Sequence, residues 1–238
     1  MSFLNSIAIV ASPRPRVGKT LLARLLTDFH LQEGRSVAAF DLNSGEGTLA
    51  QFLPEHVTRS AIDDIKGQMA LFDRLTAVDG VTKIVDLGHT SFDCFFALAN
   101  QFDFTSEART RGITPVVLYP LTPDSNSVEA YRKLRGQLSE ATLAPVQNEL
   151  LGSREYQDKY GLTGRAATVI RLPVLEPRLR RYVETPPFSF ADSGLPVSLN
   201  MSNDSNIELQ RWLRRIYLEF RELGLRMLLT DLNSSILR

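Results

Sequence analysis

The feature that most constrains this chain is an apolar run that ends in Gly18-Lys19-Thr20 and passes directly into a helical pattern. Residues 7–11 are all apolar, as in a buried parallel strand, and apolar residues recur at helical spacing over residues 22–29. The loop between them therefore lies at a helix N-terminus, where unpaired backbone N–H groups and the helix dipole favour a polyphosphate. We expect Lys19 to reach the terminal phosphate oxygens and the Thr20 hydroxyl to hold Mg²⁺, which implies ATP or GTP as the ligand.

The loop departs from the general pattern G-x-x-x-x-G-K-[ST]. Pro13 stands where the first glycine is expected, and residues 14–17 are Arg-Pro-Arg-Val instead of glycine-rich. A strand, turn and helix that meet by chance are the alternative to a phosphate-binding loop. The position of the tripeptide between strand and helix favours nucleotide binding.

Composition sets limits on the fold class. The chain has 238 residues, 43% of them hydrophobic and 23% charged, which suits one globular α/β domain over residues 1–238. Lys plus Arg and Asp plus Glu each number 27, so no overall charge attracts nucleic acid or a membrane. The single cysteine, Cys94, excludes an internal disulfide framework, and its phenylalanine neighbours predict a buried thiol. No apolar stretch approaches the roughly 18 residues of a membrane span, and we expect a cytoplasmic protein.

Strand and helix patterns alternate along the rest of the chain. The alternation predicts right-handed βαβ crossovers and a doubly wound, mostly parallel sheet with helices on both faces. Strands are expected at residues 37–40, 81–85, 115–119, 142–147 and 167–172. Helices are expected from Ile62 to near Gly80, at residues 127–138 after an Asn126 capping box, and at residues 207–229. The proline-rich residues 184–196 are expected to form an extended surface segment.

In such a sheet the ligand lies beyond the carboxyl ends of the strands, where two aspartates are expected. Asp41 follows the second expected strand and Asp86 the third. Asp86 can accept from Mg²⁺-bound water and from Thr20, and Asp41 could orient a water for attack on the γ-phosphate or join the metal site. The simpler alternative is that each aspartate ends its strand and caps the next helix. The adjacent loop favours the site.

These landmarks resemble the ParA/MinD-type P-loop ATPases, whose deviant phosphate loop is K-G-G-x-G-K-T. Residues 14–20 align with it position by position, and residues 40–45 are similar to the family's D-x-D-P-Q-G segment. Asp86-Leu87-Gly88 is similar to D-x-P-P, residues 119–123 to V-x-P-x-x-P, and residues 170–173 to a late strand that ends in proline. The resemblance covers about residues 7–184, with the landmarks in the expected order.

The resemblance implies an ATP-dependent dimer switch with slow, Mg²⁺-dependent hydrolysis, acting in DNA partition or intracellular positioning. Arg14 takes the position of the signature lysine that reaches the partner's nucleotide, and it retains the charge. Pro15 and Arg16 alter the phosphate cradle, which affects hydrolysis more than binding. The implied catalytic residues are Asp41, Lys19 and Arg14, and the implied metal ligands are Thr20, Asp41 and Asp86. The implied nucleotide contacts are Arg16, Val17, Gly18, Lys19, Thr20, Leu21, Asn148 and Pro173.

The partners implied are a second copy of the chain, an adaptor or activating protein, and nonspecific DNA, which would associate the protein with the nucleoid. The DNA contacts would come from Arg178, Arg180, Arg181, Arg211, Arg214 and Arg215. A solvated helix face is the simpler interpretation of these arginines, since acidic residues balance them. A membrane-surface role for the last helix is disfavoured because its apolar stripe is expected to pack on the sheet. Two other functions stay open: a nucleotide-binding scaffold without hydrolysis, and a small-molecule ligase or kinase similar to dethiobiotin synthetase.

Overall fold

The computed structural model describes residues 6–236 except 44, 46–47, 139, 153–157, 163–168 and 193–198, and it does not place the side chains of residues 230–236. Its centre is a seven-stranded sheet in the order β3-β2-β4-β1-β5-β6-β7. Every neighbouring pair of strands is parallel. The strands are β1 (Ser6–Val10), β2 (Val37–Leu42), β3 (Val57–Arg59), β4 (Thr82–Leu87), β5 (Thr114–Pro120), β6 (Thr142–Asn148) and β7 (Ile170–Leu172).

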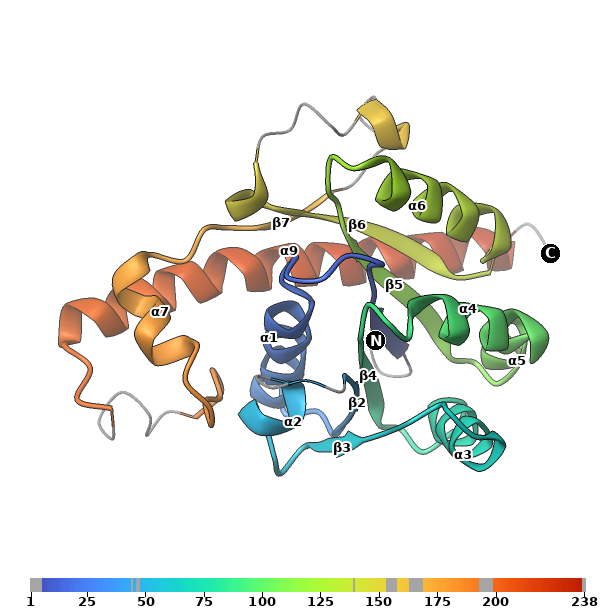
Figure 1. The fold of residues 1–238 in the computed structure, drawn as a ribbon, viewed down its shortest axis with the longest axis horizontal. Helices are drawn as coiled ribbons and strands as arrows, with labels where there is room; N and C mark the ends of the chain where they lie inside the picture. The colour runs from blue at the N-terminus through green and yellow to red at the C-terminus, as the bar shows by residue number, and fades with distance from the viewer. Residues whose placement is uncertain are drawn as a thin grey trace.

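Helices cover both faces of the sheet, so the fold is a three-layer α/β structure (Figure 1). One face carries α1 (Lys19–Gln32), α2 (Leu49–Phe52), α7 (Pro177–Val183) and the long α9 (Asn203–Ile236). The other carries α3 (Ile65–Leu75), α4 (Phe92–Gln101), α5 (Phe104–Thr110) and α6 (Ser125–Gln137). The predicted doubly wound parallel fold is therefore confirmed.

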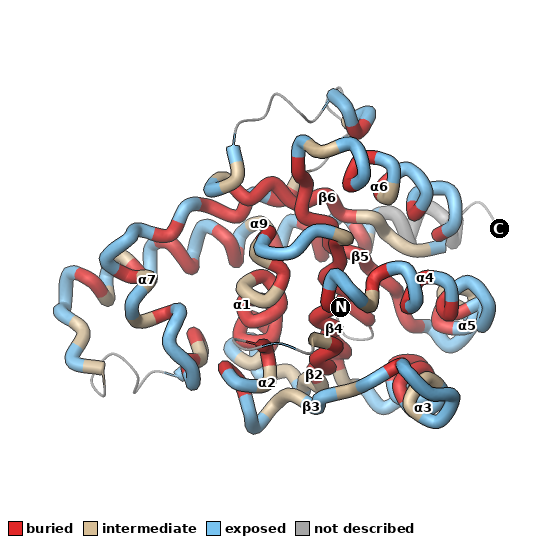
Figure 2. Tube along the Cα trace, viewed as in Figure 1, coloured by how far each residue is buried: buried red, intermediate tan, exposed pale blue. Residues whose placement is uncertain are grey.

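The side chains of strand β1 alternate between two hydrophobic cores, one on each face of the sheet. Ile7 and Ile9 point into the core beneath α4 and α6, whereas Ala8 and Val10 point into the core beneath α1 and α9. All four are at most 2% exposed, as expected for the central strand of a parallel sheet. Figure 2 shows the same burial through the neighbouring strands. Burial on both faces fixes the carboxyl end of β1, and with it the start of the loop.

Several boundaries differ from the sequence prediction. The short strand β3 was not expected. Helix α6 begins at Ser125 because Asp124, not Asn126, is its N-cap and accepts a hydrogen bond from the Ser127 backbone N–H. The last strand is confirmed from Ile170 onward, and residues 163–168 lie outside the described part of the chain.

Helix α3 is present but shorter than the predicted range from Ile62 to near Gly80, and the predicted burial of Cys94 was wrong. Ile65 and Met69 of α3 are 73% and 57% exposed, because only the end of α3 faces the core. Cys94 is exposed on the outer side of α4, while Phe92, Phe95 and Phe96 turn inward. The cysteine is therefore not a core thiol.

Residues 186–192, called the strap from here on, lie only partly on the surface, because their two phenylalanines are buried while Pro186, Pro187 and Asp192 are exposed. Phe188 and Phe190 are 3% and 5% exposed and join the core beneath α1 and α9. The strap is held by Asp28 of α1, which accepts hydrogen bonds from the Ser189 hydroxyl and the Phe190 backbone N–H, each 2.7 Å long. Gln32 of α1 donates to the Phe190 carbonyl at 2.9 Å.

Asp28 should give the stability of the protein a recognisable dependence on pH. Burial raises the pKa of Asp28 to about 6, against the hydrogen bonds from Ser189 and Phe190. The folded state therefore binds this proton more tightly than the unfolded state, and the resulting stabilisation is lost as the pH rises from about 4 to about 6. We expect that loss to be up to about 3 kcal/mol, and we expect Asp28→Asn, which mimics the protonated acid, to lack it.

Urea unfolding of wild type and Asp28→Asn at pH 4, 5, 6 and 7 measures the effect, because the difference between the two curves cancels the other titrating groups. Parallel stability curves for the two proteins would contradict the prediction.

Candidate functional site

The loop between β1 and α1 has the backbone shape of an anion-binding turn. Arg16 and Gly18 adopt left-handed conformations, with φ of +59° and +91°. Gly18 is the N-cap of α1, and its carbonyl accepts from the Leu22 backbone N–H at 3.0 Å. Successive left-handed and turn residues direct backbone N–H groups toward one point, which is how nests bind phosphate. The predicted loop at a helix N-terminus is therefore present.

Lys19 is folded back over the loop. Its ammonium donates to the Arg14 carbonyl at 2.6 Å, and the residue is only 7% exposed. Burial lowers the pKa of Lys19, and the neighbouring Asp86 carboxylate partly opposes that shift. A cation held at the centre of the loop is placed to neutralise a phosphate there.

Thr20 and Asp86 meet at the start of α1. The Thr20 hydroxyl donates to Asp86 Oδ2 at 2.7 Å, and the carboxyl group is completely buried. Burial raises the pKa of Asp86 to about 7, although the hydrogen bond from Thr20 opposes this. Asp86 Oδ1 accepts no hydrogen bond from the described residues. A hydroxyl and a carboxylate with a spare oxygen are the hard donors that Mg²⁺ prefers, so these residues fit the predicted cation.

Asp41 lies beside Asp86, but its carboxylate accepts hydrogen bonds from the residues that follow β2. The two residues are in register on β2 and β4. Asp41 Oδ1 accepts from the backbone and side-chain amide of Asn43 at 3.0 and 2.9 Å, and Oδ2 accepts from the Ala50 backbone N–H at 2.9 Å. The Asn43 amide also donates to the Asp86 carbonyl at 3.2 Å. These bonds give Asp41 a part in shaping the residues that follow β2, and they leave it few lone pairs for a water or metal.

Arg14 forms an ion pair within its own chain. Its Nε lies 3.2 Å from Asp124 Oδ2, and the side chains are 45% and 24% exposed. Asp124 is also the N-cap of α6 and accepts from the Thr122 hydroxyl at 2.5 Å. Together with Arg14, these bonds lower the pKa of Asp124. The arginine that matches the signature lysine is therefore held toward the end of β5.

Three of the remaining predicted nucleotide contacts, Asn148, Pro173 and Leu21, contact other parts of the chain. The Asn148 amide donates to the Val17 carbonyl at 3.2 Å and so ties the end of β6 to the loop. The Pro173 carbonyl accepts from the Trp212 indole N–H at 2.9 Å, which ties the end of β7 to α9. The Leu21 side chain packs against the core, so its backbone alone faces the loop. Arg16 is exposed at the tip of the loop.

Three of the six predicted DNA-contacting arginines have partners within the chain. Arg178 is bound to Glu208 at 2.6 Å, Arg180 donates to the Leu175 carbonyl, and Arg181 donates to the Tyr182 hydroxyl. The three arginines of α9 are exposed, and they are Arg211, Arg214 and Arg215. Part of the predicted patch therefore joins α7 to neighbouring residues.

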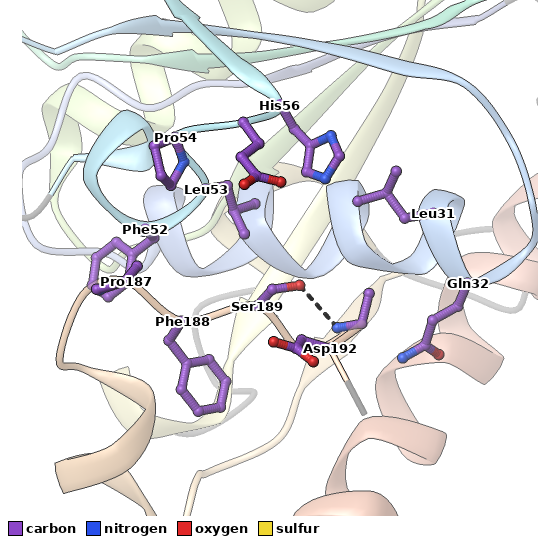
Figure 3. A pocket seen from close by; sticks show the side chains of 12 residues that line it. Leu31, Gln32, Phe52, Leu53, Pro54, His56, Pro187, Phe188, Ser189 and Asp192 are labelled. Atoms are coloured by element: carbon purple, nitrogen blue, oxygen red, sulfur yellow. Dashed lines mark hydrogen bonds between the residues drawn. The ribbon is translucent and has the colours of Figure 1, made fainter. Parts of the chain in front are cut away.

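A pocket of about 570 Å³ lies at the opposite end of α1 from the loop. It opens between the end of α1, the residues that link α2 to β3, and the strap (Figure 3). Leu31, Phe52 and Phe188 supply apolar walls, and His56 and Asp192 supply polar ones. Hydrogen bonds of the strap to α1 shape this pocket, and no sequence motif indicated it.

The sequence analysis missed Asn43 and Asp124 as members of the site. Asn43 stands two residues after Asp41, the spacing of the two acidic positions in D-x-D, which could have drawn attention to it. Asp124 follows Thr122-Pro123, where an aspartate before a helix is a recognisable N-cap signal. Its contact with Arg14 joins residues 110 positions apart and had no local signal.

No family model matches the chain, and no curated protein matches it. Solved structures do resemble it. The MinD cell division protein of Aquifex aeolicus matches with a TM-score of 0.50 at 17% identity over 92% of this chain and 97% of that one. The MinC:MinD complex of the same organism gives 0.50 at 16% over 92% and 96%. A nucleotide-binding protein from Archaeoglobus fulgidus in complex with ADP gives 0.43 at 15% over 86% and 88%.

The likeness to MinD, together with the all-parallel sheet, shows that this chain has the α/β fold of the P-loop NTPases. Among the described residues, no helix combines the length and the apolar character needed to cross a membrane.

Gly18 tests whether the loop is locked against Asn148. An added Cβ at Gly18 would lie 2.8 Å from the Asn148 amide nitrogen, whereas Gly34, also left-handed, has open space around it. We expect Gly34→Ala to cost about 1 kcal/mol of unfolding free energy from backbone strain alone, and Gly18→Ala to cost about 1–2 kcal/mol more.

Urea unfolding of both variants measures the costs. Combining Gly18→Ala with Asn148→Ala should recover part of the extra loss, because the two side chains then no longer collide. Equal costs for Gly18→Ala and Gly34→Ala would show that the contact does not constrain the loop.

Proposed function

We propose that this protein binds ATP with Mg²⁺ in the loop between β1 and α1 and acts as an ATP-dependent dimerising switch in which binding outweighs hydrolysis. The observation that carries the proposal is the arrangement of Lys19, Thr20 and Asp86. A buried lysine, a helix N-terminus and a hydroxyl bound to a buried carboxylate meet at one point. A triphosphate would supply the negative charge that Lys19 and the helix N-terminus attract. Its Mg²⁺ would supply the positive charge that Thr20 and Asp86 can hold.

Each residue has a defined part in nucleotide binding. Backbone N–H groups of residues 16–20 would cradle the phosphates, and Lys19 would turn from the Arg14 carbonyl toward the terminal phosphate. Thr20 and Asp86 would hold Mg²⁺, directly and through water, and a bound cation would favour the ionised form of Asp86. The cation would neutralise charge on the phosphate oxygens.

Slow or absent hydrolysis follows from the surroundings of Asp41. A water-positioning carboxylate needs a free lone pair directed at the water, but three of the roughly four acceptor sites of Asp41 are taken by backbone or side-chain amides, so little of it is available. Asn43, two residues after Asp41, carries an amide, which cannot act as a base. These features favour a protein that retains ATP over one that turns it over rapidly.

Dimerisation would use Arg14. Its ion pair with Asp124 is partly exposed, and such pairs are worth about 0–1 kcal/mol, so a phosphate across a dimer interface could compete for the guanidinium. An adaptor protein or nonspecific DNA would then bind the dimer, with the exposed arginines of α9 available for DNA.

Two alternative functions predict different results in an assay of ATP hydrolysis. A scaffold would bind ATP and leave it intact in single-turnover measurements, with or without DNA. A ligase or kinase similar to dethiobiotin synthetase would turn ATP over only with a small acceptor. The groove between α4 and α6, about 450 Å³ in volume, is a candidate place for such an acceptor.

Replacing Lys19 tests the binding site directly. We expect Lys19→Ala to weaken ATP binding at least 100-fold while the fold is retained, because Lys19 is the buried cation at the centre of the loop. Isothermal titration with ATP and with GTP, each with Mg²⁺, measures the affinities. Lys66→Ala, an exposed lysine on α3, is the matched control and should bind as wild type does. Unchanged affinity in Lys19→Ala would refute the phosphate-loop assignment.

Removing Arg14 tests the switch. With ATP and Mg²⁺, sedimentation should show wild type shifting from its nucleotide-free mass to a larger assembly, and Arg14→Ala should lose that shift while binding ATP with little change. A contact made only between two protomers gives this separation. Arg135→Ala, an exposed arginine near the other end of α6, should behave as wild type. A wild-type mass that ATP does not alter would leave nucleotide binding intact but remove the switch.

A further inference from the structure

The pocket beside the strap lies apart from the phosphate loop. Its volume of about 570 Å³ is within the usual range for pockets that hold small molecules. Figure 3 shows its three sides: His56 comes from the segment between α2 and β3, Leu31 from α1, and Ser189 and Asp192 from the strap. None of the described residues that line it belongs to the proposed nucleotide site.

Hydrogen bonds hold the sides of the pocket in place. The Phe188 backbone N–H donates to the Phe52 carbonyl at 3.1 Å, which joins the strap to the end of α2. The Ser189 hydroxyl and the Phe190 backbone N–H donate to Asp28, which joins the strap to α1. Because the strap is fixed to both other sides, the pocket is largely preformed.

The walls of the pocket are mainly apolar. The side chains that form them are Leu31, Phe52, Leu53, Pro54, Pro187 and Phe188. Such walls would bury an aromatic or aliphatic group, and they leave the choice among ligands to the few charged groups at the pocket.

The charged groups at the pocket favour a cation. Glu55, which follows α2, and Asp192 of the strap both carry exposed carboxylates. Among the described residues that line the pocket there is no lysine or arginine, and His56 is the one basic side chain. The pocket also lies at the C-terminal end of α1, where the helix dipole presents partial negative charge. Carboxylates and dipole together attract a cation and repel an anion.

The buried arginine behind the pocket does not reverse this preference. Arg24 lies 3.7 Å from the centre of the Phe52 ring and is 3% exposed, so it is not part of the pocket wall. The carboxylates of Asp28 and Glu184 lie close enough to stabilise its charge. The guanidinium is therefore balanced within the protein and offers no site for an anion in the pocket.

We propose that this pocket binds a small organic cation, an amine that carries an aromatic or aliphatic body. The apolar walls would bury the body, and Glu55 and Asp192 would stabilise the ammonium by charge-assisted hydrogen bonds. The amine site and the phosphate loop lie at opposite ends of α1, and amine binding does not require nucleotide.

Three indoles of similar shape test the charge of the ligand. At neutral pH tryptamine is a cation, tryptophol is neutral and indole-3-acetate is an anion. Isothermal titration of the full chain without nucleotide should show tryptamine binding at least about 10-fold more tightly than tryptophol, with indole-3-acetate weakest, because only tryptamine complements the carboxylates. Equal affinities for the three would show an apolar pocket without charge selection and would overturn the proposal. A protein that does not bind tryptamine would overturn it too.

Variants test where the ammonium lies. Glu55→Gln with Asp192→Asn removes both charges and keeps the side-chain size, so tryptamine affinity should fall at least about 10-fold while tryptophol affinity, which reports an intact pocket, stays the same. The matched control is Asp63→Asn with Asp73→Asn, which removes two exposed carboxylates outside the pocket and should bind as wild type does. Unchanged tryptamine affinity in the pocket variant, or an equal loss in the control, would overturn the site.

Discussion

The hydrogen bond from the Thr20 hydroxyl to Asp86 is the contact on which the candidate site depends, because it ties the first turn of α1 to the end of β4. Burying a carboxylate completely is costly, and the raised pKa of Asp86 reports that cost. An apolar residue in its place would pack in the core with no such penalty. A fold that keeps a buried acid with an unshared oxygen beside a lysine has the electrostatics of a binding site.

Helix α1 links this site to the rest of the structure, since it is held at both ends. Toward its middle, Arg24 lies over the Phe52 ring at 3.7 Å and donates to the Phe188 carbonyl at 3.3 Å. Burial lowers the pKa of Arg24 to about 9, so the guanidinium stays charged at neutral pH beside Asp28. The strap contacts both groups with its backbone and aromatic rings, although Arg24 Nε has no hydrogen-bond partner among the described residues. The strap is therefore held in place by the polar groups of α1 as well as by the burial of its own phenylalanines.

Sequence reasoning found what local patterns encode. The strand before the loop, the helix after it and the position of Asp86 all follow from short runs of residues. Helix α3 was predicted, but its start was placed too early because Ile62, which is buried and precedes the helix, was counted in its periodicity. The partners of Arg14 and Asn148 could not be predicted, since each contact joins segments brought together only when β5 and β6 align beside β1. The strap's partners on α1 were missed for the same reason.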